Sequence, residues 1–221
     1  MISVAIDGPA GAGKSSISRF VAKQLGFIYV DTGALYRGIG LYVLRKGKNP
    51  ASIEDVVPLL AEIKIEMRHI DAEQHIFLNG EDVSGFIRTE SVSSAASDVS
   101  AIPAVRDFLF DMQRDIADKN DVVMDGRDIG TVVLPDAELK IFLTAKPEIR
   151  AARRVRQLSE KGIDVNFDDV LADVIQRDYN DTNRDFRPLK LAEDGILLDN
   201  SELSFDKTVE KIIFLAKEHR E

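Results

Sequence analysis

The feature that most constrains the fold is a glycine-rich segment near the N-terminus, residues 8–16, which reads G-P-A-G-A-G-K-S-S. It follows an apolar run, residues 2–6, that is typical of a buried strand, and it leads into residues 13–25, where apolar side chains recur with helical spacing. Glycines between a strand and a helix let the backbone curl around a phosphate, and the helix N-terminus adds positive potential. The segment therefore predicts a loop that binds the phosphates of a nucleoside triphosphate.

Two side chains in this loop carry the expected chemistry. Lys14 has the position from which an ammonium group reaches the β- and γ-phosphates, and the hydroxyl of Ser15 is expected to complete the shell of a Mg²⁺ ion. A GTPase would also carry an N-K-x-D segment, which is absent. A motor or transporter ATPase would end a long apolar strand in Asp-Glu, whereas residues 122–125 are followed by Gly-Arg-Asp. Small-molecule kinases remain.

The rest of the chain alternates short apolar runs with amphipathic stretches, which predicts an α/β fold with a parallel sheet covered by helices. The expected strands are residues 2–6, 27–30, 122–124, 139–143 and 196–198, and the expected helices include 34–44, 147–161, 168–183 and 204–217. Residues 63–67 instead alternate apolar and charged side chains, and Asn79-Gly80 predicts a tight turn. A small antiparallel piece is therefore expected within the parallel fold.

Several polar segments follow predicted strands, where ligands bind in open parallel sheets. In residues 31–37, D-T-G-A-L-Y-R, Thr32 is expected to cap a helix while Arg37 lies one turn inside it, so both would face one phosphate. Farther along, Arg177, Asp181 and Arg184 share a helix face. From spacing alone, that trio fits a ligand site and an intrahelical salt-bridge ladder equally well.

Five segments together identify a family. By their order and spacing, these segments resemble those of the bacterial cytidylate kinases over essentially the whole chain. They are G-P-A-G-A-G-K-S, D-T-G-A-L-Y-R, G-E-D-V-S with I-R-T, D-G-R-D-I-G-T-V-V and R-D-Y-N-D-T-N-R. The resemblance implies a P-loop nucleoside monophosphate kinase fold with a five-stranded parallel sheet, an antiparallel insert and a short lid. It also implies cytoplasmic, ATP-dependent and Mg²⁺-assisted phosphorylation of CMP or dCMP to CDP or dCDP.

The resemblance also assigns site residues. The ATP site comprises Gly8, Pro9, Ala10, Gly11, Ala12, Gly13, Lys14, Ser15 and Ser16. The CMP site comprises Thr32, Arg37, Arg127 and Arg184 on the phosphate, Ser97, Arg106 and Asp128 on the base, and Arg177 and Asp181 on the sugar. Lys14, Arg127 and Arg184 are the expected catalytic residues, and Arg150, Arg153, Arg154 and Arg156 crowd the expected lid. Thr32 stands where many relatives have serine, which keeps the hydroxyl.

The whole chain is expected to form one kinase domain. Its core would comprise about residues 1–60, 100–148 and 163–221, its monophosphate-binding insert about 61–99, and its lid about 149–162. A net charge of −9 disfavours nucleic acid and anionic lipid as partners, and no apolar run is long enough for a membrane helix. The absence of cysteine excludes disulfides and fits a reducing cytoplasm. A monomer is expected.

Two other functions are compatible with these motifs. A related monophosphate kinase would prefer UMP or AMP, and a regulatory protein would keep the phosphate loop without transferring phosphate. Arg37, Arg127 and Arg184 argue against the regulator, because a pure sensor has no need for groups that hold an acceptor phosphate.

Overall fold

The computed structural model describes residues 1–71 and 73–219 and divides into two compact units. Met1–Tyr29 and Ala117–Glu221 form one unit, here called the loop unit because it holds the phosphate loop. Val30–Ile116 form the other, here called the middle unit. No helix among the described residues is both long and apolar enough to cross a membrane.

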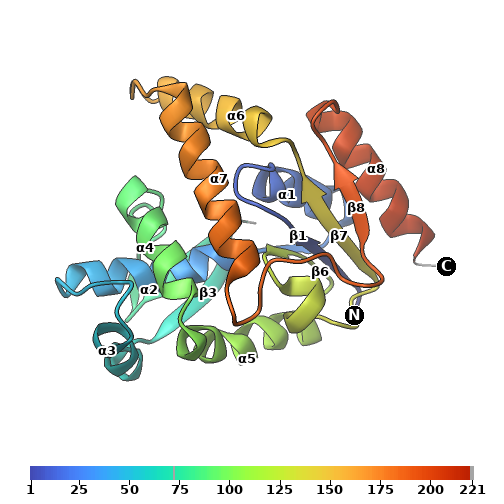
Figure 1. The fold of residues 1–221 in the computed structure, drawn as a ribbon. Coiled ribbons are helices and arrows are strands. Elements are labelled where there is room, and N and C mark those ends of the chain that lie inside the picture. The colour runs from blue at the N-terminus through green and yellow to red at the C-terminus, as the bar shows by residue number, and fades with distance from the viewer. Residues whose placement is uncertain (72, 220–221) are drawn as a thin grey trace. The chain divides into compact units, whose positions relative to one another are not determined.

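The loop unit is organised by the expected parallel sheet, in the order β2-β6-β1-β7-β8 (Figure 1). The strands of this sheet are β1 (Ser3–Asp7), β2 (Ile28–Asp31), β6 (Val122–Gly126), β7 (Leu139–Thr144) and β8 (Ile196–Asp199). The last two residues of β2 belong to the middle unit. β1 lies between β6 and β7, with Val4 opposite Val123 on one side and Leu139 on the other. The carboxyl ends of β1 and β6 therefore lie side by side, which places the segments that follow them next to each other.

Two helices and a shared apolar cluster stabilise this sheet. Helix α1 (Lys14–Leu25) and helix α8 (Phe205–Glu218) contact each other. Ile17, Val21 and Ile212 from these helices pack with β-strand residues such as Ile6 and Ile141 in one buried core. The helical spacing read from the sequence is confirmed for Ile17 and Val21 of α1 and for Val209, Ile212 and Ala216 of α8, which are buried. Phe20, expected on the same face of α1, is instead 41% exposed.

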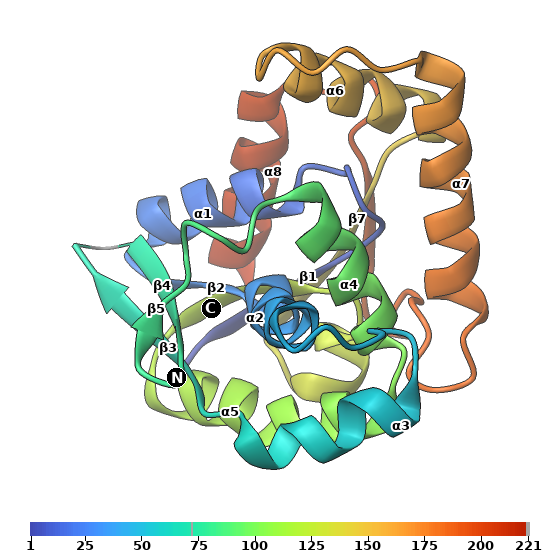
Figure 2. The ribbon, with the colours of Figure 1, turned by 90° about the vertical axis from the view of Figure 1, so that its left-hand side faces the viewer.

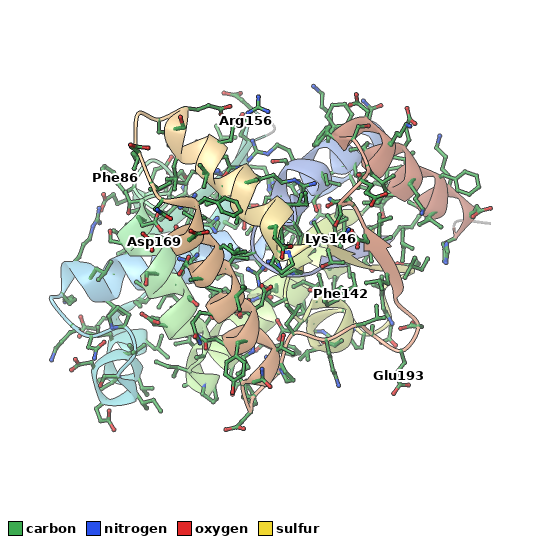
Figure 3. The ribbon with its side chains drawn as sticks, turned by 45° about the horizontal axis from the view of Figure 1, so that its top comes forward. Phe86, Phe142, Lys146, Arg156, Asp169 and Glu193 are labelled. Atoms are coloured by element: carbon green, nitrogen blue, oxygen red, sulfur yellow. The ribbon has the colours of Figure 1, made fainter. Side chains whose placement is uncertain are left out.

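The remaining elements of the loop unit follow β6 and β7. A short π-helical turn, η2 (Ile129–Val133), begins directly after Asp128. Helices α6 (Pro147–Ser159) and α7 (Phe167–Asn183) pack against each other, and the Asn166 side chain caps α7 by accepting from the backbone N–H groups of Asp168 and Asp169. In Figure 3, Arg156 marks α6 and Asp169 marks the first turn of α7.

The middle unit is built around helix α2 (Thr32–Arg45), which packs on helix α4 (Glu90–Ser100) (Figure 2). A Cβ added at Gly40 would lie 3.0 Å from the backbone nitrogen of Ala96, so glycine permits this close approach. The expected antiparallel piece is the sheet β3 (Ile65–Ile70), β4 (Glu73–Leu78) and β5 (Glu81–Asp82). The unit also contains α3 (Ile53–Val56), η1 (Val57–Glu62) and most of α5 (Pro103–Lys119).

Most predicted elements are confirmed, with three differences. The parallel and antiparallel strands occur where expected, and the tight turn has positive φ at Asn79 (50°) and Gly80 (87°). Helix α2, however, begins at Thr32 instead of residue 34, because Asp31 caps it. Helix α4 and the π-helical turn η2 were not predicted from the sequence.

Candidate active site

The phosphate loop connects β1 to α1, and its backbone requires glycine at its first position. Gly8 has a φ of 148°, and a Cβ added there would lie 1.9 Å from the carbonyl oxygen of Leu143 on the neighbouring strand β7. Lys14 is buried and curls back over the loop, donating from Nζ to the carbonyl oxygen of Pro9 at 2.7 Å. The loop therefore places a buried cation at the N-terminus of a helix, which suits a phosphate group.

The charges around Lys14 are arranged for an anion. Burial lowers the pKa of Lys14, and the nearby Arg127 guanidinium lowers it further, while Asp125, Asp181 and Asp7 act in the opposite direction. A negatively charged phosphate brought next to Nζ would favour the protonated form again. The lysine is therefore best stabilised as a cation when an anion occupies the loop.

A carboxylate beside the loop was not singled out by the sequence pattern. Ser15 donates from Oγ to Oδ2 of Asp125 at 3.0 Å, and Tyr29 donates from its hydroxyl to Oδ1 at 2.9 Å. Asp125 reaches this place because β6, near whose end it lies, is the neighbour of β1 in the sheet. The sequence placed Asp125 at the end of a predicted strand, but it did not reveal the order of the strands in the sheet.

This oxygen donor set fits Mg²⁺. A hydroxyl and a carboxylate are hard ligands, and Mg²⁺ in nucleotide sites is held by one or two protein oxygens together with phosphate oxygens. Within residues 1–71 and 73–219, no group of three or more His, Cys, Asp or Glu side chains is placed to hold a metal by itself. An ion here would depend on the nucleotide.

Asp7, the last residue of β1, joins the phosphate loop to the turn after β6. Its Oδ1 accepts from the backbone N–H of Ile129 at 2.8 Å, and its Oδ2 accepts from that of Gly130 at 2.7 Å. Burial raises the pKa of Asp7 to about 6, although these two hydrogen bonds act to lower it. The carboxylate thus holds the start of η2, immediately after Arg127 and Asp128.

Three of the predicted CMP residues come together in the loop unit. Arg127 donates from Nε to Oδ2 of Asp181 at 2.8 Å, and Nη1 of Arg184 lies 3.8 Å from Oδ1 of the same carboxylate. Burial opposes ionisation of Asp181, yet Arg127 and Arg184 hold its pKa below the ordinary value. Two guanidinium groups and one carboxylate therefore form a compact charged cluster at the C-terminal end of α7.

The other two predicted residues of this unit lie close by in the fold. Arg177 forms an ion pair with Asp173, from Nε to Oδ2 at 3.0 Å, one turn earlier on α7. Of the ladder considered for Arg177, Asp181 and Arg184, the contact between the last two is present, at 3.8 Å. Asp128 is buried at the start of η2, and its side chain does not cap that turn.

The arginines of α6 have different roles, and the expectation that all four belong to an exposed lid is wrong for Arg150. Arg150 is 2% exposed; it donates from Nε to the carbonyl oxygen of Ala145 at 2.8 Å and from Nη1 to that of Ala10 at 3.0 Å. It also forms a two-point ion pair with Asp178 on α7. Arg150 is therefore a structural link between the phosphate loop, β7 and α7.

Arg153 and Arg154 are partly buried, and Arg156 is exposed. Arg153 bonds to Asn200, from Nη1 to Oδ1 and from Nη2 to the carbonyl oxygen, both at 3.1 Å. Asn200 in turn donates from Nδ2 to the carbonyl oxygen of Ala12 in the phosphate loop at 2.9 Å. Arg156 pairs with Glu160 on its own helix.

In the middle unit, Thr32 and Arg37 lie in the N-terminal part of α2, which Asp31 precedes. Asp31, and not Thr32, caps the helix: Oδ1 of Asp31 accepts from the backbone N–H of Ala34 at 3.0 Å. Oδ2 of Asp31 accepts from Nη2 of Arg37 at 2.7 Å. Thr32 is the buried first residue of the helix. The expectation that Thr32 caps α2 is wrong because the preceding carboxylate takes that role.

Ser97 and Arg106 both interact with Ser100. Ser97 is on α4, and its carbonyl oxygen accepts from Oγ of Ser100. Arg106, buried on α5, donates from Nε to the carbonyl oxygen of Ser100 at 2.6 Å, and its guanidinium lies 5.4 Å from the centre of the Tyr36 ring. The middle unit thus holds four of the predicted CMP residues, which are Thr32, Arg37, Ser97 and Arg106.

Comparison with known proteins identifies the relatives of this chain. The family described as cytidylate kinase matches residues 4–218. A protein named cytidylate kinase from Caldicellulosiruptor bescii is 50% identical over 97% of this chain and 95% of its own length. Another from Carboxydothermus hydrogenoformans is 48% identical over 95% of each chain. The solved structure of an uncharacterised protein from Eubacterium ventriosum shares the fold, with a TM-score of 0.55 at 14% identity, over 98% of this chain and 99% of that one.

Proposed function

This chain belongs to the cytidylate kinase family, and we propose that it transfers the γ-phosphoryl group of ATP to CMP or dCMP, giving ADP and CDP or dCDP. The observation that best supports this reaction is the cationic cluster of the loop unit. Arg127 and Arg184 both contact one carboxylate, Asp181, whose charge also acts on Lys14 in the phosphate loop. Phosphoryl transfer depends mainly on positioning and charge neutralisation, which this cluster supplies.

For the donor, we propose that Gly8–Ser16 bind the phosphates of ATP, with their backbone N–H groups and Lys14. Ser15 and Asp125 would hold Mg²⁺, whose charge would neutralise the phosphate oxygens. Lys14 stays protonated beside those phosphates, so its ammonium group binds the bridging region of the β- and γ-phosphates. These residues orient the γ-phosphate for attack from the side opposite ADP.

For the acceptor phosphate, we propose Thr32, Arg37, Arg127 and Arg184. An oxygen of the CMP phosphate forms the new bond to the γ-phosphorus as the bond from that phosphorus to the β,γ-bridging oxygen breaks, and ADP leaves with that electron pair. The attacking phosphate is already largely ionised at neutral pH, so no protein base has to remove a proton. The arginines place two anions next to each other and offset their repulsion, which is their catalytic contribution.

For the nucleoside, we propose Ser97, Arg106 and Asp128 on the cytosine base and Arg177 and Asp181 on the sugar. The base residues supply both hydrogen-bond polarities, since Arg106 donates and the Asp128 carboxylate accepts. Cytosine carries an amino donor as well as ring acceptors, so it matches this combination. Both Arg106 and Asp128 are buried, which strengthens the penalty for a base that presents the wrong hydrogen-bond polarity to either group.

The lid is proposed for residues 149–162 without Arg150, within a single kinase domain that also comprises the core and the insert of residues 61–99. Arg153, Arg154 and Arg156 are the remaining candidates for contact with the transferring phosphate. Backbone amides around Arg156 are expected to exchange hydrogen more slowly when ATP and CMP analogues are both bound. Equal exchange with and without the two analogues would contradict a lid. We further propose a monomer, which sedimentation analysis tests.

The activity itself is tested by coupled ADP release with CMP, dCMP, UMP and AMP as separate acceptors. We expect turnover with CMP and dCMP that exceeds turnover with UMP and AMP by at least about tenfold in kcat/KM. Preference for UMP or AMP would assign a different monophosphate kinase. ATP binding without any acceptor-dependent ADP release would indicate a regulatory nucleotide-binding protein.

A further inference from the structure

The side-chain amide of Gln74 is paired with the backbone of Asp31. Gln74 lies on β4 of the antiparallel sheet, and Asp31 is the last residue of β2. Oε1 of Gln74 accepts from the backbone N–H of Asp31 at 2.7 Å, and Nε2 donates to the carbonyl oxygen of Asp31 at 3.0 Å. Both contacts lie within the middle unit.

This pairing satisfies backbone groups that an edge strand leaves open. β2 is the terminal strand in the order β2-β6-β1-β7-β8, so its outer side has no neighbouring strand in the described sheet. A primary amide carries one acceptor and one donor in a plane, as a peptide unit does. Gln74 therefore replaces a strand residue at the single position where β2 ends and α2 begins.

Asp31 is the residue on which the N-terminal turn of α2 depends. Its buried carboxylate caps the helix through Ala34 and holds Arg37 through Nη2, at 3.0 and 2.7 Å. Nε of Arg37 is buried without a hydrogen-bond partner among the described residues, so the ion pair with Asp31 is its principal anchor there. Fixing the backbone of Asp31 on both its N–H and its carbonyl side fixes the direction of that carboxylate.

We propose that Gln74 is a positioning residue for the acceptor phosphate: its amide holds Asp31, and Asp31 holds Arg37. The proposal rests on the proposed function, in which Arg37 binds the phosphate of CMP. Glutamine suits this task because glutamate lacks the donor, methionine lacks both polar groups, and asparagine is one methylene shorter. The antiparallel insert thereby acts on the phosphate through one side chain.

The test is a double-mutant cycle of Gln74→Met and Arg37→Met, with kcat/KM for CMP measured at saturating ATP. We expect Gln74→Met to lower this value about tenfold in the otherwise unchanged protein, since two hydrogen bonds to a partly buried backbone are lost. With Arg37→Met already present, the same substitution should lower it less than about twofold. KM for ATP should be unchanged by Gln74→Met. Gln24→Met, which removes an exposed amide from the last turn of α1, serves as the control and should have no effect.

An equal fold loss from Gln74→Met in both backgrounds would overturn the positioning role, because a purely structural defect does not depend on Arg37. If Arg37→Met alone leaves kcat/KM for CMP unchanged, the phosphate role proposed for Arg37 fails, and the role of Gln74 fails with it. Gln74→Glu provides a second variant of nearly the same shape, should Gln74→Met not fold. It retains the acceptor for the Asp31 N–H, loses the donor, and should show the same dependence on Arg37.

Discussion

Arg127 and Asp181 are bound to each other, from Nε to Oδ2 at 2.8 Å, although they are proposed to contact different parts of CMP. Arg127 is assigned to the acceptor phosphate and Asp181 to the sugar. The carboxylate of Asp181 therefore occupies part of the hydrogen-bonding capacity that a phosphate needs, and Arg184 lies within 3.8 Å of it as well. Binding of a phosphate has to compete with this internal anion.

Replacing Asp181 with asparagine should remove that competition. Inorganic phosphate, used as an inhibitor competitive with CMP, should bind Asp181→Asn about three- to tenfold more tightly, because two arginines lose their carboxylate partner. CMP should not share this gain, since it also loses the carboxylate proposed for its sugar. Asp169→Asn removes an equal charge from the exposed first turn of α7 and is the control (Figure 3). Unchanged or weaker inhibition by phosphate would contradict the argument.

Lys14→Ala should abolish most of the activity without unfolding the protein. The ammonium group is aimed at phosphate and contacts the protein through one backbone carbonyl, so its loss should lower kcat by at least about a hundredfold. Circular dichroism should still show a folded chain. Lys23→Ala, an exposed lysine in the last turn of the same helix, should keep normal turnover. Near-normal turnover of Lys14→Ala would refute the role of this loop.

The sequence predicted the helices and turns that are determined by residues close together in the chain. Apolar periodicity predicted α1 and α8, and the turn residues Asn79-Gly80 predicted the hairpin of the insert. Helix α4, which packs on α2, was missed because it is rich in serine, a residue of low helix propensity that is also common in turns. The π-helical turn η2 was missed because it depends on Asp7, which is more than 100 positions away in the chain.

For the candidate site too, local motifs could be predicted, whereas contacts between residues far apart in the chain could not. Motif spacing predicted Lys14 and Ser15 and drew attention to Arg37, Arg177 and Arg184, and the family resemblance assigned the arginines their roles. Neither could show that Asp125 contacts Ser15, since that contact depends on strand order. Charge clustering also could not separate buried Arg150 from exposed Arg156, because the partner of Arg150 lies on another helix.

Asp7 should make the stability of the protein depend on pH between about 4 and 6. Its pKa is raised from 3.8 to about 6, so the folded protein holds the proton in a range where the unfolded chain releases it. The contribution of Asp7 to stability is therefore present below pH 4 and lost as pH rises through 6, by about 3 kcal/mol. Urea unfolding of the wild type and Asp7→Asn at pH 4 to 7 tests this. As pH rises, the free energy of unfolding of the variant should increase relative to that of the wild type. A constant difference would rule out a raised pKa for Asp7.

Arg150 and Arg156 should differ in stability, as their contacts do. Arg150→Met leaves Asp178 without its partner and removes the link to Ala10, so the free energy of unfolding should fall by about 3 kcal/mol. Arg156→Met removes only an exposed pair within one helix and should change it by less than about 0.5 kcal/mol. Denaturant unfolding of both variants measures this directly. Similar losses for the two would mean that the contacts of Arg150 contribute no more than a surface ion pair.

Asp128 is the residue whose replacement tests base choice most sharply. Cytosine presents an amino donor where uracil presents a carbonyl acceptor, and the Asp128 carboxylate can only accept. Facing uracil, the buried carboxylate would meet another acceptor, and the repulsion between the two is costly. The position is supported by the turn that follows, because Asp7 holds the N–H groups of Ile129 and Gly130.

Asp128→Asn should therefore erode the preference for CMP over UMP, because an amide can donate as well as accept. The decisive quantity is the ratio of kcat/KM for CMP to that for UMP, which should fall by about tenfold or more. If Asp128 acted only in the local structure, both substrates would lose activity alike and the ratio would not move. Thermal unfolding of the variant separates this case, since a defect in packing lowers Tm without changing the ratio. An unchanged ratio would refute base reading by Asp128, whatever the absolute rates.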